Sequence, residues 1–218
     1  MFGPIVDFFK GLASYAAPVV PNFRPPVKKT IVPAEAYQNT ERWKGIVIHH
    51  SACADSPGDD WTAIRKYHMS YRIDGTTVDE QTFKNRQLLG QGTTFEKPWT
   101  DIAYHGGWEK DNGVYQFKLG RSWNKAGAHA GLKGNNTFNE QYLGFCLVGD
   151  WDKMSPPQEA WDLAVATVRE VCDTLNISTG NIIGHREVYD LAGVKRQKTC
   201  PGTLFDMGKF RRDVCSKE

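Results

Sequence analysis

Three side chains, far apart in the sequence, are of the types that hold a catalytic metal ion. His49 and His185 each end a short apolar run, and Cys200 lies in the segment KTCPG (198–202). Imidazole and thiolate are zinc ligands, and three protein ligands leave a fourth position open for water. An open zinc ion lowers the pKa of its bound water to about 7 and polarises a carbonyl, as amide hydrolysis requires. The spacing of the three residues alone is weak evidence for such a site.

The apolar pattern around these residues predicts the elements that must position them. The run GIVIHHS (45–51) is typical of a buried strand, and successive side chains of a strand point to opposite faces. Only one of His49 and His50 can therefore be a ligand. We predict further strands over 101–108, 113–120, 142–150 and 181–185, and helices over 59–71, 155–175 and 204–214. Residues 72–98 are predicted to form a long loop region with one short strand. Strands interleaved with helices indicate a single α/β domain with a central mixed β-sheet flanked by helices.

Composition excludes several functional classes. The 218 residues carry 27 basic and 25 acidic side chains, so no strong positive charge suggests a nucleic-acid partner. No run of 18 apolar residues predicts a membrane-spanning helix. Five cysteines without a CxxC pair argue against a zinc ribbon and are consistent with synthesis in a reducing compartment. A disulfide among the cysteines other than Cys200 remains an open alternative.

The first 40 residues form a predicted N-terminal extension, and residues 41–218 the catalytic domain. Residues 1–17 are predicted to form a short amphipathic helix, with Ile5, Phe8, Phe9 and Leu12 on one side. This helix either docks on the main domain or contacts a membrane or the cell envelope. Five prolines within residues 18–33 indicate an extended linker.

Seven short motifs, taken together, resemble one enzyme family. They are VIHHSA (47–52), IRKYH (64–68), DIAYH (101–105), GAHA (127–130), GFCLVGD (144–150), GHREV (184–188) and KTCPG (198–202). In this order they resemble the zinc-dependent N-acetylmuramoyl-L-alanine amidases, which include phage lytic amidases and peptidoglycan recognition proteins. The likeness covers roughly residues 43–214 and is greatest to the short phage enzymes.

The resemblance implies a fold, a reaction and a set of site residues. The fold would be that of the peptidoglycan recognition proteins, and the substrate would be the amide between N-acetylmuramic acid and L-alanine in peptidoglycan. The family's Zn²⁺ ligands fall on His49, His185 and Cys200. Tyr104 matches a residue that helps to hold the zinc-bound water, and Lys198 one that stabilises the oxyanion. His129, in GAHA, matches a segment that lines the substrate groove.

The remaining histidines, Cys146 and three tryptophans have simpler interpretations. His50, His68 and His105 are predicted to be hydrogen-bonded packing residues, and Cys146 a small buried hydrophobe. Trp99, Trp108 and Trp123 could stack on substrate, although core packing is the commoner role of such residues. The chain departs from the compact phage enzymes in its N-terminal extension and in longer segments before DIAYH and between His185 and Cys200.

The biological role predicted from the resemblance is that of a phage endolysin. Such a protein, expected to be a monomer, accumulates in the host cytoplasm and then acts on the cell wall from the periplasmic side. Three alternatives stay open: a bacterial cell-wall amidase, a muropeptide-recycling amidase and a non-catalytic peptidoglycan-binding protein. Cys200 argues against the last two, because recycling enzymes of this kind have an acidic ligand there and binding proteins commonly have serine.

Overall fold

The computed structural model describes residues 30–38, 40–53 and 60–216. The interpretations given above for residues 1–17 and for the proline-rich linker up to residue 29 lie outside the described residues.

A five-stranded mixed sheet forms the centre of the domain, with the strand order β6-β5-β7-β1-β8. Strand β1 pairs in parallel with β7 and β8, β7 pairs in parallel with β5, and β5 and β6 form an antiparallel hairpin. The strands are β1 (Gly45–His50), β5 (Gly106–Asp111), β6 (Val114–Leu119), β7 (Tyr142–Leu147) and β8 (Ile182–Gly184). The chain is thus a single α/β domain with a central mixed sheet and flanking helices, which confirms the predicted fold class.

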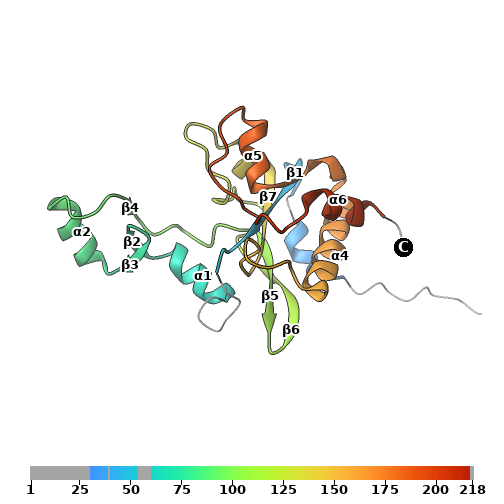
Figure 1. Ribbon diagram of the computed structural model, residues 1–218, viewed down its shortest axis with the longest axis horizontal. Coiled ribbons are helices and arrows are strands. Elements are labelled where there is room, and N and C mark those ends of the chain that lie inside the picture. The colour runs from blue at the N-terminus through green and yellow to red at the C-terminus, as the bar shows by residue number, and fades with distance from the viewer. Residues whose placement is uncertain (1–29, 39, 54–59, 217–218) are drawn as a thin grey trace, which may run out of the picture.

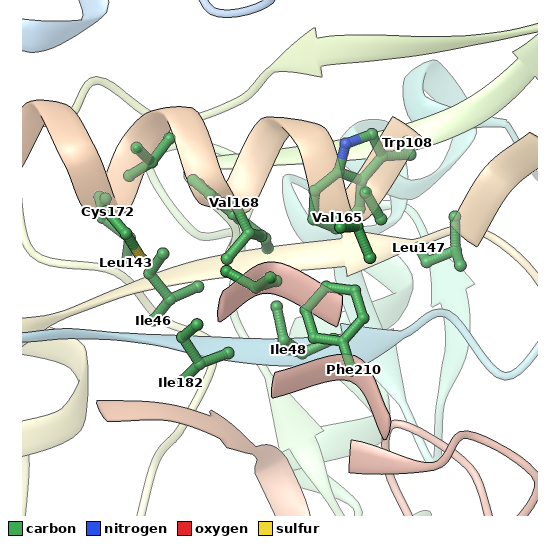
Figure 2. Close-up of a cluster of buried hydrophobic side chains, with 14 of the residues drawn as sticks. Ile46, Ile48, Trp108, Leu143, Leu147, Val165, Val168, Cys172, Ile182 and Phe210 are labelled. Carbon is green, nitrogen blue, oxygen red and sulfur yellow. The ribbon is translucent and has the colours of Figure 1, made fainter. Parts of the chain in front are cut away.

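The larger core lies between this sheet and helices α4 (Gln158–Leu175) and α6 (Met207–Cys215). Figure 2 shows Val165, Val168 and Cys172 of α4 directed toward Ile46 and Leu143 of the sheet. Strands β1 and β7 are buried on both faces, which explains why their sequences are continuous apolar runs. Helix α4 begins at Gln158, three residues after the start predicted at residue 155, and it has no side-chain cap.

Replacing Phe210 by alanine should be one of the most destabilising single changes in this core. Phe210 is fully buried and packs against Trp161 and Phe205. Truncation leaves a cavity that should lower the free energy of unfolding by about 3–5 kcal/mol. Urea denaturation measures the effect. Leu88→Ala, at a side chain that is 87% exposed, should stay within about 0.5 kcal/mol of the parent, and equal effects of the two changes would contradict this description of the core.

The opposite face of the sheet carries three short helices and the site. They are α1 (Trp61–His68), α3 (Thr137–Gln141) and α5 (His185–Leu191). Val47 of β1 belongs to the small core on this face with Ile183 and Val188, whereas Ile46 and Ile48 belong to the α4 side. Because side chains alternate along a strand, His49 points to the same face of the sheet as Val47, and His50 points to the same face as Ile46 and Ile48. Because β1 and β8 are parallel, His49 and His185 meet at the same edge of the sheet.

A second, three-stranded sheet projects from the domain, and here the sequence-based prediction is wrong. Residues 72–98, predicted as a long loop region with one short strand, contain helix α2 and nearly all of the three-stranded sheet β3-β2-β4. The elements are β2 (Tyr71–Ile73), β3 (Thr76–Val78), α2 (Glu80–Leu88) and β4 (Phe95–Glu96). Figure 1 shows this unit at one end of the molecule, with α1 between it and the central sheet.

Several element boundaries also differ from those predicted. The strand predicted over 101–108 begins only at Gly106, so Tyr104 and His105 precede it. The helix predicted to reach residue 71 ends at His68. His185 is the first residue of α5, which was not predicted. Two 3-10 turns complete the described elements, η1 (Ala34–Tyr37) and η2 (Thr179–Asn181). None of the helices in the described part of the chain is long and apolar enough to span a bilayer.

Candidate metal centre and its pocket

His49, His185 and Cys200 converge at the edge of the sheet, and all three are buried. One nitrogen of each histidine and the cysteine sulfur lie within 4.8 Å of one another. The Sγ atom of Cys200 is 3.6 Å from Nδ1 of His49. A tetrahedral zinc ion, with bonds of about 2.3 Å to sulfur and about 2.1 Å to nitrogen, holds such a pair of ligands about 3.6 Å apart. The three side chains therefore have a spacing that suits zinc.

The hydrogen bonding of the three residues also fits a metal ion. Nε2 of His185 is buried and has no hydrogen-bond partner among the residues that the structure describes, and a buried polar atom is rarely left in that state. Burial lowers the pKa of His185 to about 4 and lowers that of His49 well below its usual range, so both rings are neutral at pH 7. Burial raises the pKa of the Cys200 thiol to about 12. Metal binding must then displace the thiol proton.

Arg186 holds the segment that carries Cys200. Its guanidinium donates to the carbonyl oxygens of Thr199, Gly202 and Phe205, and its backbone N–H donates to the carbonyl of Cys200. The arginine follows His185 directly in the motif GHREV, so one turn of α5 ties two candidate ligands together. These hydrogen bonds explain how the Cys200 thiol keeps a defined position although a long loop separates it from His185.

Tyr104 and Lys198 line the same pocket as the three candidate ligands. The Tyr104 ring lies 5.2 Å from that of His49, measured between centroids. Burial, with smaller contributions from the neighbouring Cys146, Cys200 and Cys53, raises the pKa of Tyr104 well above its usual range, so the hydroxyl keeps its proton. Lys198 is exposed at the rim. The structure thus brings all five predicted residues around one pocket.

His129 also lines this pocket and is only 6% exposed. Its Nδ1 is 3.0 Å from Nε2 of His49, and its Nε2 is 3.1 Å from the carbonyl oxygen of Tyr142. Both ring nitrogens are therefore engaged within the protein. The sequence motif led to His129 as a groove residue, but it could not reveal this contact with His49.

Further residues line the pocket besides the predicted site residues, among them Trp99, for which the sequence left substrate stacking open. His68 and Trp99 stack at 4.8 Å between ring centroids and form an aromatic wall. Glu96 and Arg196 add charged groups to the lining. His68 accepts a hydrogen bond from the N–H of Ala103, as predicted for a packing residue, but it is half-buried and lines the pocket instead of the core. The closeness of His68 to Trp99 depends on the projecting sheet, which the sequence-based prediction did not include.

His50 points away from the three candidate ligands. Its Nδ1 accepts from the backbone N–H of Trp151, and its Nε2 lies 3.9 Å from Asp152. His50, Asp150 and Asp152 form a second group with atoms close enough to share a cation, but the carboxylates are already engaged. Asp150 pairs with Lys153, and Asp152 accepts from Thr199 and Thr203.

The other predicted packing residues are where the sequence places them. Cys146, Trp108 and Trp123 are buried. The five cysteines all lie in the described part of the chain, and no disulfide joins any of them. His105 is fully buried: its Nδ1 accepts from the N–H of Gly144, and its Nε2 donates to the carbonyl of Lys125.

The burial of His105 predicts a pH dependence of stability. Burial lowers its pKa to about 3 in the folded protein, against about 6.5 in an unfolded chain. Between pH 6.5 and 3 the unfolded state therefore binds a proton that the folded state does not, and the free energy of unfolding falls as the pH falls. One such histidine contributes up to about 1.4 kcal/mol per pH unit. We expect urea denaturation of chelator-treated protein at pH 7, 6 and 5 to show this loss. His105→Gln should have a shallower slope, and an unchanged slope would contradict the assignment.

Sequence comparison relates the chain to a family profile and to a curated protein. The profile of the N-acetylmuramoyl-L-alanine amidase family matches residues 39–203. Peptidoglycan-recognition protein LB of Drosophila melanogaster is 31% identical over 113 residues, which is 49% of this chain. The match spans 40% of the length of that curated relative.

Structural comparison agrees with this at the level of the fold. The endolysine N-acetylmuramoyl-L-alanine amidase LysCS from Clostridium intestinale URNW superposes with a TM-score of 0.54 and 20% identity, covering 86% of this chain and 91% of that one. The amidase LysC from the same organism gives a TM-score of 0.51 and 18% identity, covering 86% and 93%. At these identities the likeness concerns the arrangement of the elements.

Proposed function

The chain belongs to the N-acetylmuramoyl-L-alanine amidase family, and on this premise we propose that it is a zinc-dependent peptidoglycan hydrolase. Its substrate is the amide bond between N-acetylmuramic acid and the L-alanine of the stem peptide. The observation that carries the proposal is the buried group of His49, His185 and Cys200, with an unpartnered Nε2 on His185, in one pocket with Tyr104 and Lys198.

Each site residue has a role that its position supports. Nδ1 of His49, Nε2 of His185 and the Cys200 thiolate would hold the ion, which when bound supplies a Lewis acid and an activated water for attack on the amide. Tyr104 keeps its proton and beside His49 can orient the attacking water by hydrogen bonding. Lys198 brings a positive charge to the rim, where it stabilises the negative charge that develops on the carbonyl oxygen.

The pocket walls suit a substrate that is part sugar and part peptide. The stacked rings of His68 and Trp99 offer an apolar face of the kind on which sugar rings pack. Lys198, in the segment between α5 and Cys200, offers positive charge to a carboxylate of a stem peptide. The Arg196 guanidinium in the same segment is paired with Asp190.

We further propose the endolysin role, with residues 41–218 as the catalytic domain and a monomer as the active form. The motifs of the short phage enzymes and the family match over residues 39–203 support it. The protein would accumulate in the host cytoplasm and reach the wall once the inner membrane is breached. Expression in a bacterial host should then cause lysis only after the inner membrane is permeabilised, and lysis without that treatment would contradict this role.

Mass spectrometry of purified sacculi treated with the protein tests the reaction itself. We expect free stem peptides with L-alanine at the new amino terminus and glycan strands that retain intact muramic acid. Excess EDTA should stop their release, and zinc should restore it. Binding to sacculi without any new amino terminus would favour a non-catalytic binding protein instead. Cleavage of soluble muropeptides but not of sacculi would favour a recycling enzyme.

A further inference from the structure

The two neighbouring imidazoles of His49 and His129 form a chain of hydrogen bonds that ends on the backbone. Nε2 of His49 is 3.0 Å from Nδ1 of His129, and Nε2 of His129 is 3.1 Å from the carbonyl oxygen of Tyr142. The two rings meet edge to face, at 5.0 Å between centroids. Both rings are buried, which limits the access of water to these positions.

The final acceptor determines which nitrogen donates in each of these hydrogen bonds. A carbonyl oxygen can only accept, so Nε2 of His129 must carry a proton. In a neutral ring Nδ1 of His129 is then bare, and it accepts from Nε2–H of His49. His49 in turn has a bare Nδ1, which is the atom that faces the sulfur of Cys200 at 3.6 Å. The hydrogen bonds therefore select the one tautomer of His49 that can bind a metal ion on the Cys200 side.

The protein builds a close-fitting site around the His129 ring. A Cβ atom added at Gly144 would lie 2.3 Å from Cγ and Cδ2 of this ring, and one added at Gly127 would lie 2.4 Å from Cδ2. Any side chain at either position would displace the imidazole. The backbone of the segment is fixed as well, because Oδ1 of the buried Asn139 accepts from the N–H groups of both His129 and Ala130 at 2.8 Å.

We propose that His129 is a positioning residue that fixes the tautomer and the rotation of the His49 ring, so that Nδ1 of His49 is presented to the metal ion. The proposal rests on the metal centre proposed above. It also differs from the role implied by the motif, in which His129 touches the substrate. Outer-sphere partners of metal-binding histidines typically change metal affinity by 10–100-fold when removed.

The affinity for zinc, measured by competition with a chromophoric chelator, distinguishes these roles. His129→Leu keeps a similar volume without an acceptor and should weaken zinc binding by about 10–100-fold. His129→Asn places Oδ1 near the former Nδ1 and should recover most of the affinity. Gly144→Ala should weaken binding by displacing the ring, whereas Gly180→Ala, whose methyl group meets only the Ser178 hydroxyl at 3.7 Å, should not. Circular dichroism and thermal melting of each metal-free variant report whether the fold is intact.

Two results of these measurements would overturn the proposal. One is a folded His129→Leu variant that binds zinc as tightly as the parent, with only its KM raised, because that outcome assigns His129 to the substrate. The other is a His129→Asn variant no better than His129→Leu. A parent protein that binds no zinc would instead count against the proposed function.

Nitrogen–proton correlation spectra of the metal-free parent protein, labelled with ¹⁵N-histidine, report which ring nitrogen of each histidine carries a proton. They need no substitution. We expect His49 and His129 both to be protonated on Nε2 only, whether or not the protein later proves to bind zinc. A proton on Nδ1 of His129 would make His129 the donor to His49 and would refute the positioning role.

Discussion

Cys200→Ser should lose both bound zinc and amide hydrolysis while the protein stays folded. The thiolate is the only sulfur ligand of the proposed set, and it lies 3.6 Å from Nδ1 of His49. A serine hydroxyl is a poor zinc ligand at neutral pH, because it does not ionise. Zinc typically supplies several kcal/mol of transition-state stabilisation, so the rate should fall by about a thousandfold or more. Metal analysis and the release of new amino termini from sacculi measure the two effects.

Cys215→Ser is the matched control for this substitution. Cys215 is an exposed free thiol at the end of α6, and its replacement should leave zinc content and rate unchanged. A Cys200→Ser protein with full zinc content and full rate would remove the cysteine from the metal centre.

Lys198→Ala should reduce kcat by about 10²–10³-fold, with a smaller effect on KM, as expected for loss of a group that stabilises an oxyanion. The side chain lies at the rim of the pocket with Tyr104 and the three candidate ligands. The positive charge is needed mainly when negative charge develops on the attacked carbonyl, so binding of the ground state depends on it less. Steady-state kinetics on a soluble muropeptide separate the two parameters.

Lys195→Ala tests whether the effect on kcat is specific to Lys198 or follows from the loss of any positive charge in the same loop. Lys195 is exposed in the segment between α5 and Cys200, and its removal should leave kcat within about twofold, as for a screened surface charge. If Lys198→Ala raised only KM, or if both variants lost activity equally, Lys198 would be a substrate-binding residue or a general electrostatic contributor.

The central part of the fold and the site could be predicted from the sequence because local patterns determine them. Continuous apolar runs mark β1 and β7, and alternation within β1 separates His49 from His50 onto different faces. Strand ends then bring His49 and His185 together, since parallel neighbours share an edge. Motifs supplied Tyr104, Lys198 and His129, and the structure places all three at the pocket.

The projecting sheet was missed because its strands are too short to show a period. Strands β2, β3 and β4 contain two or three residues each, and β4 joins β2 only through tertiary pairing. Two local signals were nevertheless present. Asp74–Gly75, both with positive φ, form the turn between β2 and β3, and an Asp-Gly pair is a strong hairpin signal. Asp79 caps α2 by accepting from the N–H of Thr82.

The contacts that complete the site depend on tertiary structure. Trp99 reaches His68 because the projecting sheet returns the chain to α1, where the N–H of Trp99 donates to the carbonyl of His68. The bond between His129 and His49 joins residues 80 positions apart. No periodicity or spacing reports such a contact, although the glycines at 127 and 144 are the residues that make room for it.

The most direct test of the metal centre is anomalous diffraction from crystals of the zinc-loaded protein, with data on both sides of the zinc absorption edge. We predict one strong anomalous peak within bonding distance of Nδ1 of His49, Nε2 of His185 and Sγ of Cys200. A zinc-loaded protein without a peak at these atoms, or with its peak between His50, Asp150 and Asp152 instead, would contradict the account.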